Sequence, residues 1–156
     1  YLIFHRVETD ICGDYVDTLD FNTERINKCI VVLGPRVGMW DSNKVGISGP
    51  PIKTKYGWLL LYHGVSKRHS TYRIGAVLLD LNDPTIVLAR STDPVFEPTE
   101  EYEKVGVVNN VVFPCGSVVK NGIVYIYYGG ADKVVGVAEC PLKDLVEPLV
   151  RGSQLC

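Results

Sequence analysis

The stretch from Trp40 to Gly64 reads WDSNKVGISGPPIKTKYGWLLLYHG, and the fold of the chain is built around it. A polar segment rich in glycine and proline runs there directly into a strongly apolar segment that ends at His63 and Gly64. Loops anchored on packed strands are where binding and catalytic groups concentrate. The stretch therefore predicts a rigid strand with charged groups close to its ends.

Short apolar segments bounded by Gly, Pro, Asn and Asp continue in both directions and predict further strands. Downstream, Gly57 supplies the turn between Ile52–Thr54 and Trp58–Val65, and Tyr72–Leu81 follows as the next strand. Upstream, Val7–Asn27 is rich in acids and amides and is expected to form a loop or a short irregular hairpin.

Two helical segments are expected. Thr99–Lys104 fits one helical turn with Thr99 as its cap. Cys140–Gly152 places leucines on one face, but Pro148 is expected to limit that helix to about two turns.

The chain contains an internal repeat. FPCGSVVKNGIVYIYYGGAD, from Phe113, follows the pattern of PPIKTKYGWLLLYHGVS, from Pro50. One offset of 65 residues pairs Gly57 with Gly122, Tyr62 with Tyr127 and His63 with Tyr128. A repeat of this kind indicates one four-stranded propeller blade, longer than the usual ~40 to 50 residues.

The segment Tyr1–Arg6 resembles the inner strand of the same unit once more, and it begins as a strand already under way. The sequence thus predicts an all-β, partial β-propeller in a single domain over residues 1–156. It would contain a little over two blades of four-stranded antiparallel sheet, which cannot close a ring. The chain is therefore expected to be a portion of something longer.

Composition excludes several classes of function. The net charge of -2, without a lysine or arginine run, argues against nucleic-acid binding. No apolar run reaches the ~20 residues of a membrane-spanning helix. The cysteines are odd in number and irregularly spaced without a CxxC pair, which leaves zinc and redox motifs unsupported. Such a set favours reduced thiols in a cytoplasmic protein over a disulfide framework, while a Cys12–Cys29 bridge stays open. They are Cys12, Cys29, Cys115, Cys140 and Cys156.

Five segments together resemble the C-terminal half of glycoside hydrolase family 130, the β-mannoside phosphorylases and their hydrolytic relatives. They are FHR at Phe4, GPRVGMWDSNKVGISGPPIKTKYGWLLLYHGVS at Gly34, YRIGAVLLDLNDP at Tyr72, EYEKVGVVNNVVFPCG at Glu101 and YYGGAD at Tyr127. The resemblance implies a five-bladed β-propeller with the active site in its central funnel. It also implies inverting cleavage of a β-mannoside oligosaccharide by inorganic phosphate, giving mannose 1-phosphate, with no metal and no cofactor beyond that co-substrate.

The resemblance assigns phosphate contacts to Lys44, His63, Arg6 and Tyr72. Phosphorolysis brings a dianion beside an electron-rich sugar, so a site for it needs cations and donors on a rigid frame. Taken without the family, Lys44 is expected to be a solvated loop cation and His63 a hydrogen-bonded residue at a strand end.

The sugar side is assigned by the same resemblance to Asp132, which would accept hydrogen bonds from mannose hydroxyls. Trp40 would offer an apolar face to a sugar ring, and Asp41 would orient Lys44. Their alternatives are a turn-forming role for Asp132 and a packing role for Trp40. No segment resembles the N-terminal half of the family, which supplies the acid donor.

Two other functions stay open at this stage. The first is a hydrolase of the same family, in which water replaces phosphate and the cations of the phosphate site would be dispensable. The second is a non-catalytic binding or assembly module, whose open blade edges would favour a homo-oligomer that covers them.

Overall fold

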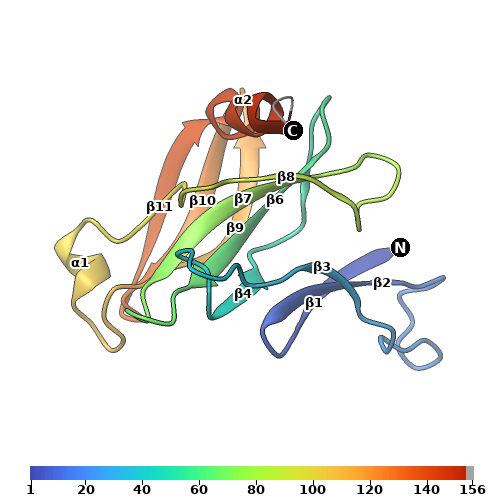
Figure 1. The fold of residues 1–156 in the computed structure, drawn as a ribbon, viewed down its shortest axis with the longest axis horizontal. Coiled ribbons are helices and arrows are strands. Elements are labelled where there is room, and N and C mark those ends of the chain that lie inside the picture. The colour runs from blue at the N-terminus through green and yellow to red at the C-terminus, as the bar shows by residue number, and fades with distance from the viewer. Residues whose placement is uncertain (154–156) are drawn as a thin grey trace.

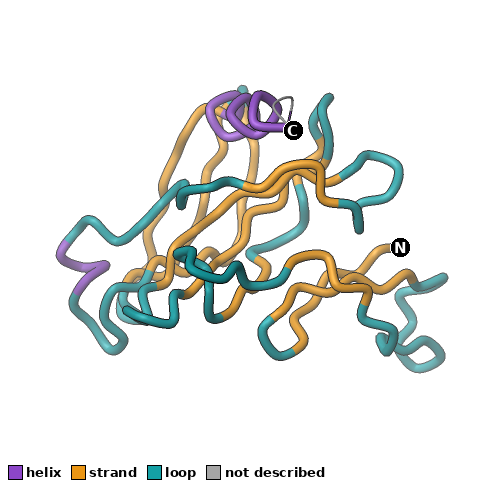
Figure 2. Tube along the Cα trace, in the orientation of Figure 1, coloured by secondary structure: helices purple, strands orange, loops and turns teal. Residues whose placement is uncertain are grey.

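The structure, a computed structural model, describes residues 1–153 as three antiparallel β-sheets that follow one another along the chain (Figure 1). The first sheet contains β1 (Leu2–Val7), β2 (Asp10–Tyr15) and β3 (Ile30–Leu33). The three sheets do not close into a ring, and loops and two helices occupy the periphery (Figure 2). The all-β prediction is confirmed.

The second sheet is the largest and lies between the other two. Its path runs through β4 (Lys44–Ile47), β6 (Trp58–Val65), β7 (Tyr72–Leu79) and β8 (Val87–Arg90), and the short β5 (Ile52–Lys53) also pairs with β6. The polar, glycine-rich sequence predicted a loop here, and this was wrong for Lys44–Ile47. The strand forms because its backbone pairs with β6 from Val65 to Tyr62.

The third sheet contains β9 (Val112–Lys120), β10 (Ile123–Gly130) and β11 (Val134–Pro141), with β10 in the middle. One face packs on the second sheet, whereas the other leaves Tyr127, Val135 and Val137 exposed. The alternation of buried and exposed residues along β10 and β11 follows from this one-sided packing.

Two hydrophobic clusters hold the sheets together. Leu59, Leu61 and Ile74 face the third sheet and the C-terminal helix, whereas Leu60 and Tyr62 face the first sheet. Both faces of the second sheet are therefore covered, which explains the nearly continuous apolar sequence of its strands.

The internal repeat is present, but its register differs from the prediction. Tyr62 lies opposite Gly75, and Tyr128 lies opposite Gly136. Each tyrosine ring occupies the space that a side chain would need at its glycine. Tyr62 therefore corresponds to Tyr128 and not to Tyr127, because a shift of one residue along a strand moves a side chain to the opposite face.

The helices differ from their predicted lengths and caps. The short α1 (Glu101–Lys104) begins after Glu100, so Thr99 is not its cap. The C-terminal α2 (Leu142–Ser153) runs for 12 residues and continues through Pro148. Burial of Leu145 and Leu149 in the core outweighs the backbone hydrogen bond that proline cannot form.

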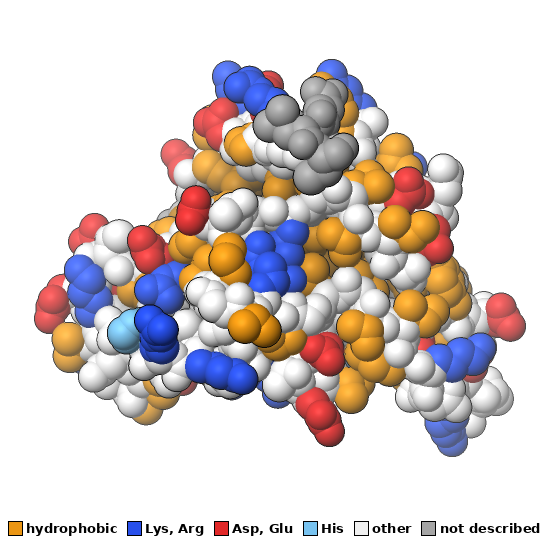
Figure 3. Space-filling view, viewed as in Figure 1, with side chains coloured by type: hydrophobic (Ala, Val, Ile, Leu, Met, Phe, Trp, Pro, Cys, Tyr) orange, Lys and Arg blue, Asp and Glu red, His pale blue; other side chains and the backbone are white. Residues whose placement is uncertain are grey.

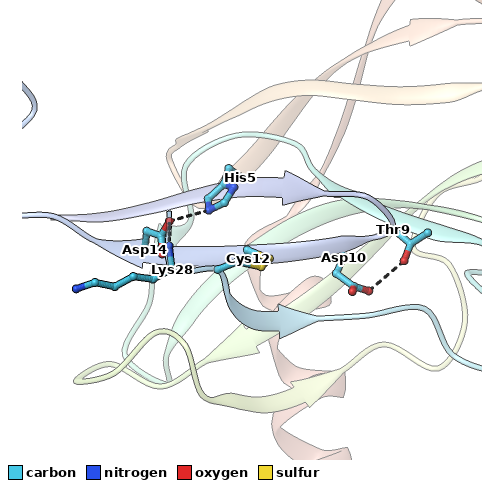
Figure 4. The surroundings of a disulfide bond; sticks show 7 residues. His5, Thr9, Asp10, Cys12, Asp14 and Lys28 are labelled. Carbon is cyan, nitrogen blue, oxygen red and sulfur yellow. Dashed lines mark hydrogen bonds and ion pairs between the residues drawn. A yellow bond between two sulfur atoms is a disulfide. The ribbon is translucent and has the colours of Figure 1, made fainter. Parts of the chain in front are cut away.

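Cys12 and Cys29 form a disulfide, with their Cα atoms 4.9 Å apart (Figure 4). The prediction of reduced thiols was wrong for this pair. Pairing of β2 with β3 brings the residue before β3 back beside Cys12, which cysteine spacing alone does not reveal. The bridge also removes the thiol-based argument for a cytoplasmic location.

Two of the remaining cysteines, Cys115 and Cys140, are free thiols, and Cys156 lies outside the described residues. Within residues 1–153, no helix is long and apolar enough to cross a membrane.

Candidate functional site

The second sheet brings Lys44, His63 and Tyr72 onto one face. Lys44 and Tyr72 both pair with Val65, one from each neighbouring strand, and His63 precedes Val65 by two residues. Directly paired residues, and residues two apart on one strand, point to the same side of a sheet. The register therefore places the three side chains together at the end of the sheet, facing the third sheet.

Aromatic contacts fix the imidazole of His63. Its ring centroid lies 4.6 Å from that of Phe113 on β9 and 5.8 Å from that of Tyr72. The Lys44 ammonium lies 5.1 Å from the centroid of the Tyr72 ring, within the range of a cation–π interaction. Phe113 was not singled out from the sequence, because its contact with His63 joins two strands that are far apart in the chain.

Gly46 makes room for His63 on the neighbouring strand. The two residues are paired, and a Cβ on Gly46 would lie 2.4 Å from Cε1 of the imidazole. Real Cβ atoms do not approach other atoms so closely. The glycine is therefore required for the position of the histidine ring.

Arg6 reaches the same region from the first sheet. It is exposed near the end of β1, and the turn after β1 is tied to β4 by a 2.9 Å hydrogen bond from Val45 N to Thr9 O. Burial of the imidazole, followed by the charges of Arg6 and Lys44, lowers the pKa of His63 to about 4. His63 is thus neutral near pH 7, with two cations beside it.

His63 is 4% exposed, and its Nδ1 atom has no hydrogen-bond partner in the described part of the chain. Buried polar atoms are normally paired, so an orphaned ring nitrogen on an imidazole that lies near two cations indicates a place where a ligand completes the bonding. A group of this composition suits an oxyanion, because cations and an N–H donor all favour negative oxygen atoms.

Asp132 lies in the tight turn between β10 and β11. Ala131 and Asp132 have φ angles of 48° and 52°, and Lys133 N donates to Gly130 O at 3.0 Å. Two successive residues in the left-handed region define a hairpin turn that usually contains Asn or Gly. The Asp132 side chain is exposed, at the same end of the sheet as Phe113.

Asp41 lies elsewhere, in a buried network on the opposite face of the second sheet. It is 0% exposed. Its carboxylate accepts hydrogen bonds from Arg36 Nη2 at 2.8 Å, Arg90 Nη2 at 2.7 Å and the Tyr62 hydroxyl at 2.9 Å. Burial is the main cause that raises the pKa of Tyr62 to about 12, although the charge and the hydrogen bond of Arg90 act to lower this pKa. Arg90 ends β8, and nothing in the surrounding sequence predicted its contact with Asp41.

Trp40 packs beside this network. Its ring stacks on Tyr62 with centroids 5.7 Å apart, and its Nε1 donates to Thr92 O at 2.9 Å. It also lines a groove of about 860 Å³ between the loops 37–42, 66–69 and 92–97. Figure 3 shows basic side chains and a histidine gathered at the lower left of one face, in keeping with the exposed Lys67, Arg68 and His69 of this groove.

The open array of antiparallel sheets is propeller-like, and it holds a group of cationic and aromatic side chains at the strand ends of the second sheet. Residues 1–151 match the family model described as β-1,4-mannooligosaccharide phosphorylase. The chain belongs to this family, glycoside hydrolase family 130.

Individual relatives agree with this assignment. The chain is 48% identical over 145 residues to a 1,2-β-oligomannan phosphorylase from Thermoanaerobacter sp. (strain X514), covering 93% of this chain and 47% of that protein. The solved β-1,2-mannobiose phosphorylase from Listeria innocua, in complex with β-1,2-mannobiose, superposes with a TM-score of 0.75 at 43% identity, covering 78% of this chain and 34% of the other.

A third relative, also a solved structure, concerns hydrolysis in this family. It comes from work on family members that are glycoside hydrolases targeting β-1,2-mannosidic linkages in Candida mannan, and it matches with a TM-score of 0.75 at 28% identity, covering 91% of this chain and 43% of that one. The chain thus spans about half the length, or less, of the relatives it matches.

Proposed function

We propose that this chain forms part of an inverting β-mannoside phosphorylase and supplies most of its phosphate-binding side. The observation that carries the proposal is the buried His63 with its unpartnered Nδ1, beside Lys44, Arg6 and Tyr72. Lys44 and Arg6 would hold phosphate as charged donors. His63 and the Tyr72 hydroxyl would orient it.

The proposed reaction is a displacement at the anomeric carbon of mannose. A phosphate oxygen forms a bond to C1 while the bond from C1 to the glycosidic oxygen breaks, which inverts the configuration. The departing oxygen takes a proton from a carboxylic acid, which we assign to the half of the propeller that this chain does not span. Cations fixed beside the phosphate reduce the repulsion between the dianion and the electron-rich sugar.

On the sugar side, we assign Asp132 to the mannose hydroxyls, because its carboxylate is exposed at the same end of the third sheet as Phe113. Asp41 and Trp40 contact Tyr62 on the opposite face of the second sheet, so we assign them supporting roles without direct contact with the sugar. The carboxylate of Asp41 is fully engaged by protein groups, so it fixes the loop that leads into β4 and thereby Lys44.

β-1,2-linked mannosides are the first substrates to test, since both phosphorylases reported above are named for that linkage. The family model is described for β-1,4-mannooligosaccharides, so these form the second set. A central funnel in a five-bladed ring, completed by the remainder of the protein, is the architecture we expect around the site.

The test compares this chain with a fusion enzyme, in which the chain replaces the matching segment of the Thermoanaerobacter 1,2-β-oligomannan phosphorylase. Each is incubated with mannose 1-phosphate and a panel of acceptors, and released phosphate is measured. Activity in the fusion enzyme alone would support the proposal. Activity in the short chain would mean that a carboxylate within it or a second subunit supplies the proton. An inactive but folded fusion enzyme would contradict the proposal.

The alternative reaction is hydrolysis, because the family also contains glycoside hydrolases that target β-1,2-mannosidic linkages. It predicts that β-mannobiose is cleaved by the fusion enzyme equally well with and without phosphate. The cationic group at Lys44 and Arg6 favours phosphorolysis, because water needs no cations to bring it beside the sugar.

A further inference from the structure

A buried carboxylate, Glu103, lies beside the proposed site without belonging to it. Glu103 is 1% exposed and accepts hydrogen bonds from the Tyr128 hydroxyl at 2.6 Å and from the backbone N–H groups of Thr99 and Glu100 at 2.8 and 2.9 Å. Burial alone would raise the pKa of Glu103, but these hydrogen bonds lower it, so the carboxylate is ionised near pH 7. A charge this deeply buried is costly unless it is fully bonded, as it is here.

The loop that follows Glu103 touches both halves of the proposed site. Its consecutive carbonyl groups at Asn110 and Val111 accept hydrogen bonds from Tyr72 N and Ala131 N, each at 3.0 Å. Tyr72 belongs to the phosphate side, and Ala131 precedes Asp132. One short segment therefore fixes the distance between the two sides.

The same loop covers the turn that carries Asp132. Val108 N donates to Ala131 O at 3.1 Å, so both backbone polar groups of Ala131 are bonded to the loop. A Cβ on Gly106 would lie 2.3 Å from Ala131 O, which shows how closely the two backbones approach. Ala131 is 0% exposed although it lies in a turn.

Glu103, at the start of the loop, is bonded both to the end of the loop and to the strand that carries Asp132. Its carbonyl accepts from Val111 N at 2.9 Å, and its carboxylate binds Tyr128, which lies on the strand leading to the Asp132 turn. The second sheet contains the same device, since Tyr62 corresponds to Tyr128 and donates to Asp41 in the loop that leads into β4. In both places, a tyrosine opposite a glycine donates to a carboxylate in the loop that leads into the strand beside its own, β4 beside β6 and β9 beside β10.

We infer that Glu103 and Tyr128 are positioning residues that set Asp132 relative to Tyr72, and so align the sugar with the phosphate. This inference rests on the proposed function for its catalytic consequence but not for its structural part. Misplacement of a bound group by about 1 Å can cost about a hundredfold in rate. Loosening the loop is therefore expected to affect the reaction without removing any group that touches a substrate.

The experiment uses Tyr128→Phe and Glu103→Gln in the fusion enzyme, with Tyr127→Phe as the matched control. Tyr127 is the neighbouring residue on the same strand, but its side chain is 48% exposed on the opposite face. The first readout is hydrogen–deuterium exchange of the Tyr72 and Ala131 amides, which requires no activity. Both variants should accelerate exchange at these two amides, and the control should not.

The second readout is steady-state kinetics with mannose 1-phosphate. Tyr128→Phe should raise KM and lower kcat/KM by about tenfold to a hundredfold. A general loss of folded protein would lower kcat by reducing the active fraction, with KM unchanged.

Unaltered amide exchange in both variants would overturn the inference, and so would altered exchange with unaltered KM and kcat. If the unmodified fusion enzyme is folded but has no phosphorolytic activity, the proposed function fails. The positioning of the loop is then judged by exchange alone.

Discussion

Gly46 and His63 are paired across β4 and β6, and the imidazole occupies the space that a side chain on residue 46 would fill. Gly46→Ala should therefore displace the His63 ring from its contact with Phe113. We expect the affinity for phosphate to fall by at least about tenfold, with a loss of about 1 to 3 kcal/mol in the free energy of unfolding from overpacking. Calorimetric titration of the fusion enzyme with phosphate and urea unfolding measure the two effects.

The matched control for this variant is Gly116→Ala. Gly116 lies on β9, the strand that also carries Phe113, but a Cβ there would meet no atom within 4 Å. Equal losses of phosphate affinity in both variants would show that the contact with His63 is not the cause.

The depressed pKa of His63 predicts an acid-sensitive stability. The ordinary pKa of histidine is 6.5, and that of His63 in the folded chain is about 4. Between these values the unfolded chain binds a proton that the folded chain does not, so stability is complete above about pH 6.5 and is lost as pH falls towards 4. The contribution is on the order of 3 kcal/mol.

Urea unfolding at several pH values between 4 and 7, in buffers without phosphate, should show this loss in the unmodified chain. His63→Gln should reduce it, because glutamine does not titrate. Parallel curves for the two proteins would rule out His63 as the group responsible.

Asp132→Asn tests the sugar side without disturbing the turn. Asparagine tolerates the left-handed backbone that residue 132 adopts, so the fold is expected to persist. The amide is a weaker acceptor than the carboxylate, and we expect kcat/KM for mannose 1-phosphate to fall by about ten- to a hundredfold. Phosphate affinity, measured separately by calorimetry, should stay within about twofold. A selective loss of phosphate affinity would assign Asp132 to the wrong side of the site.

Asp41→Ala tests the buried network in the second sheet. Removing the carboxylate leaves Arg36 and Arg90 without their common partner, and breaking a buried ion pair costs about 3 to 5 kcal/mol. Glu147→Ala removes the exposed ion pair with Arg151 in α2 and should cost less than about 1 kcal/mol. Urea unfolding of the two variants compares them, and similar losses would contradict the structural role of Asp41.

The sequence was most informative where backbone pattern decides the structure. Apolar runs such as Trp58–Val65 and turn residues such as Gly57 predicted the strands of the second sheet, and the repeat predicted a blade-like unit. The register of that repeat was wrong by one residue, since the pairing of Tyr62 with Tyr128 depends on which face each strand buries. The helix end predicted at Pro148 was wrong, because α2 is held by burial of Leu145 and Leu149 in the core. That burial depends on the tertiary structure and is not visible in the local sequence.

The candidate site was less accessible to local reasoning. Lys44 and His63 are ordinary residues in sequence, and the family resemblance singled them out. Phe113, Arg90 and Glu103 contact residues that are 25 to 50 positions away in the chain. Local sequence patterns do not predict contacts over such separations. The disulfide between Cys12 and Cys29 was left open as a possibility and not favoured, because it depends on how β3 returns to β2.

The central claim is that this chain provides the phosphate side of a phosphorylase, and Lys44 tests it most directly. Phosphate binding to the fusion enzyme should be measured by calorimetry for the unmodified protein, Lys44→Met and Lys53→Met. Lys53 is the matched control, a lysine on β5 whose ammonium lies 5.4 Å from the ring centroid of Trp58. We predict a loss of affinity of about ten- to a hundredfold for Lys44→Met alone. Phosphate affinity that is unchanged in Lys44→Met, or equally reduced in both variants, would contradict the account.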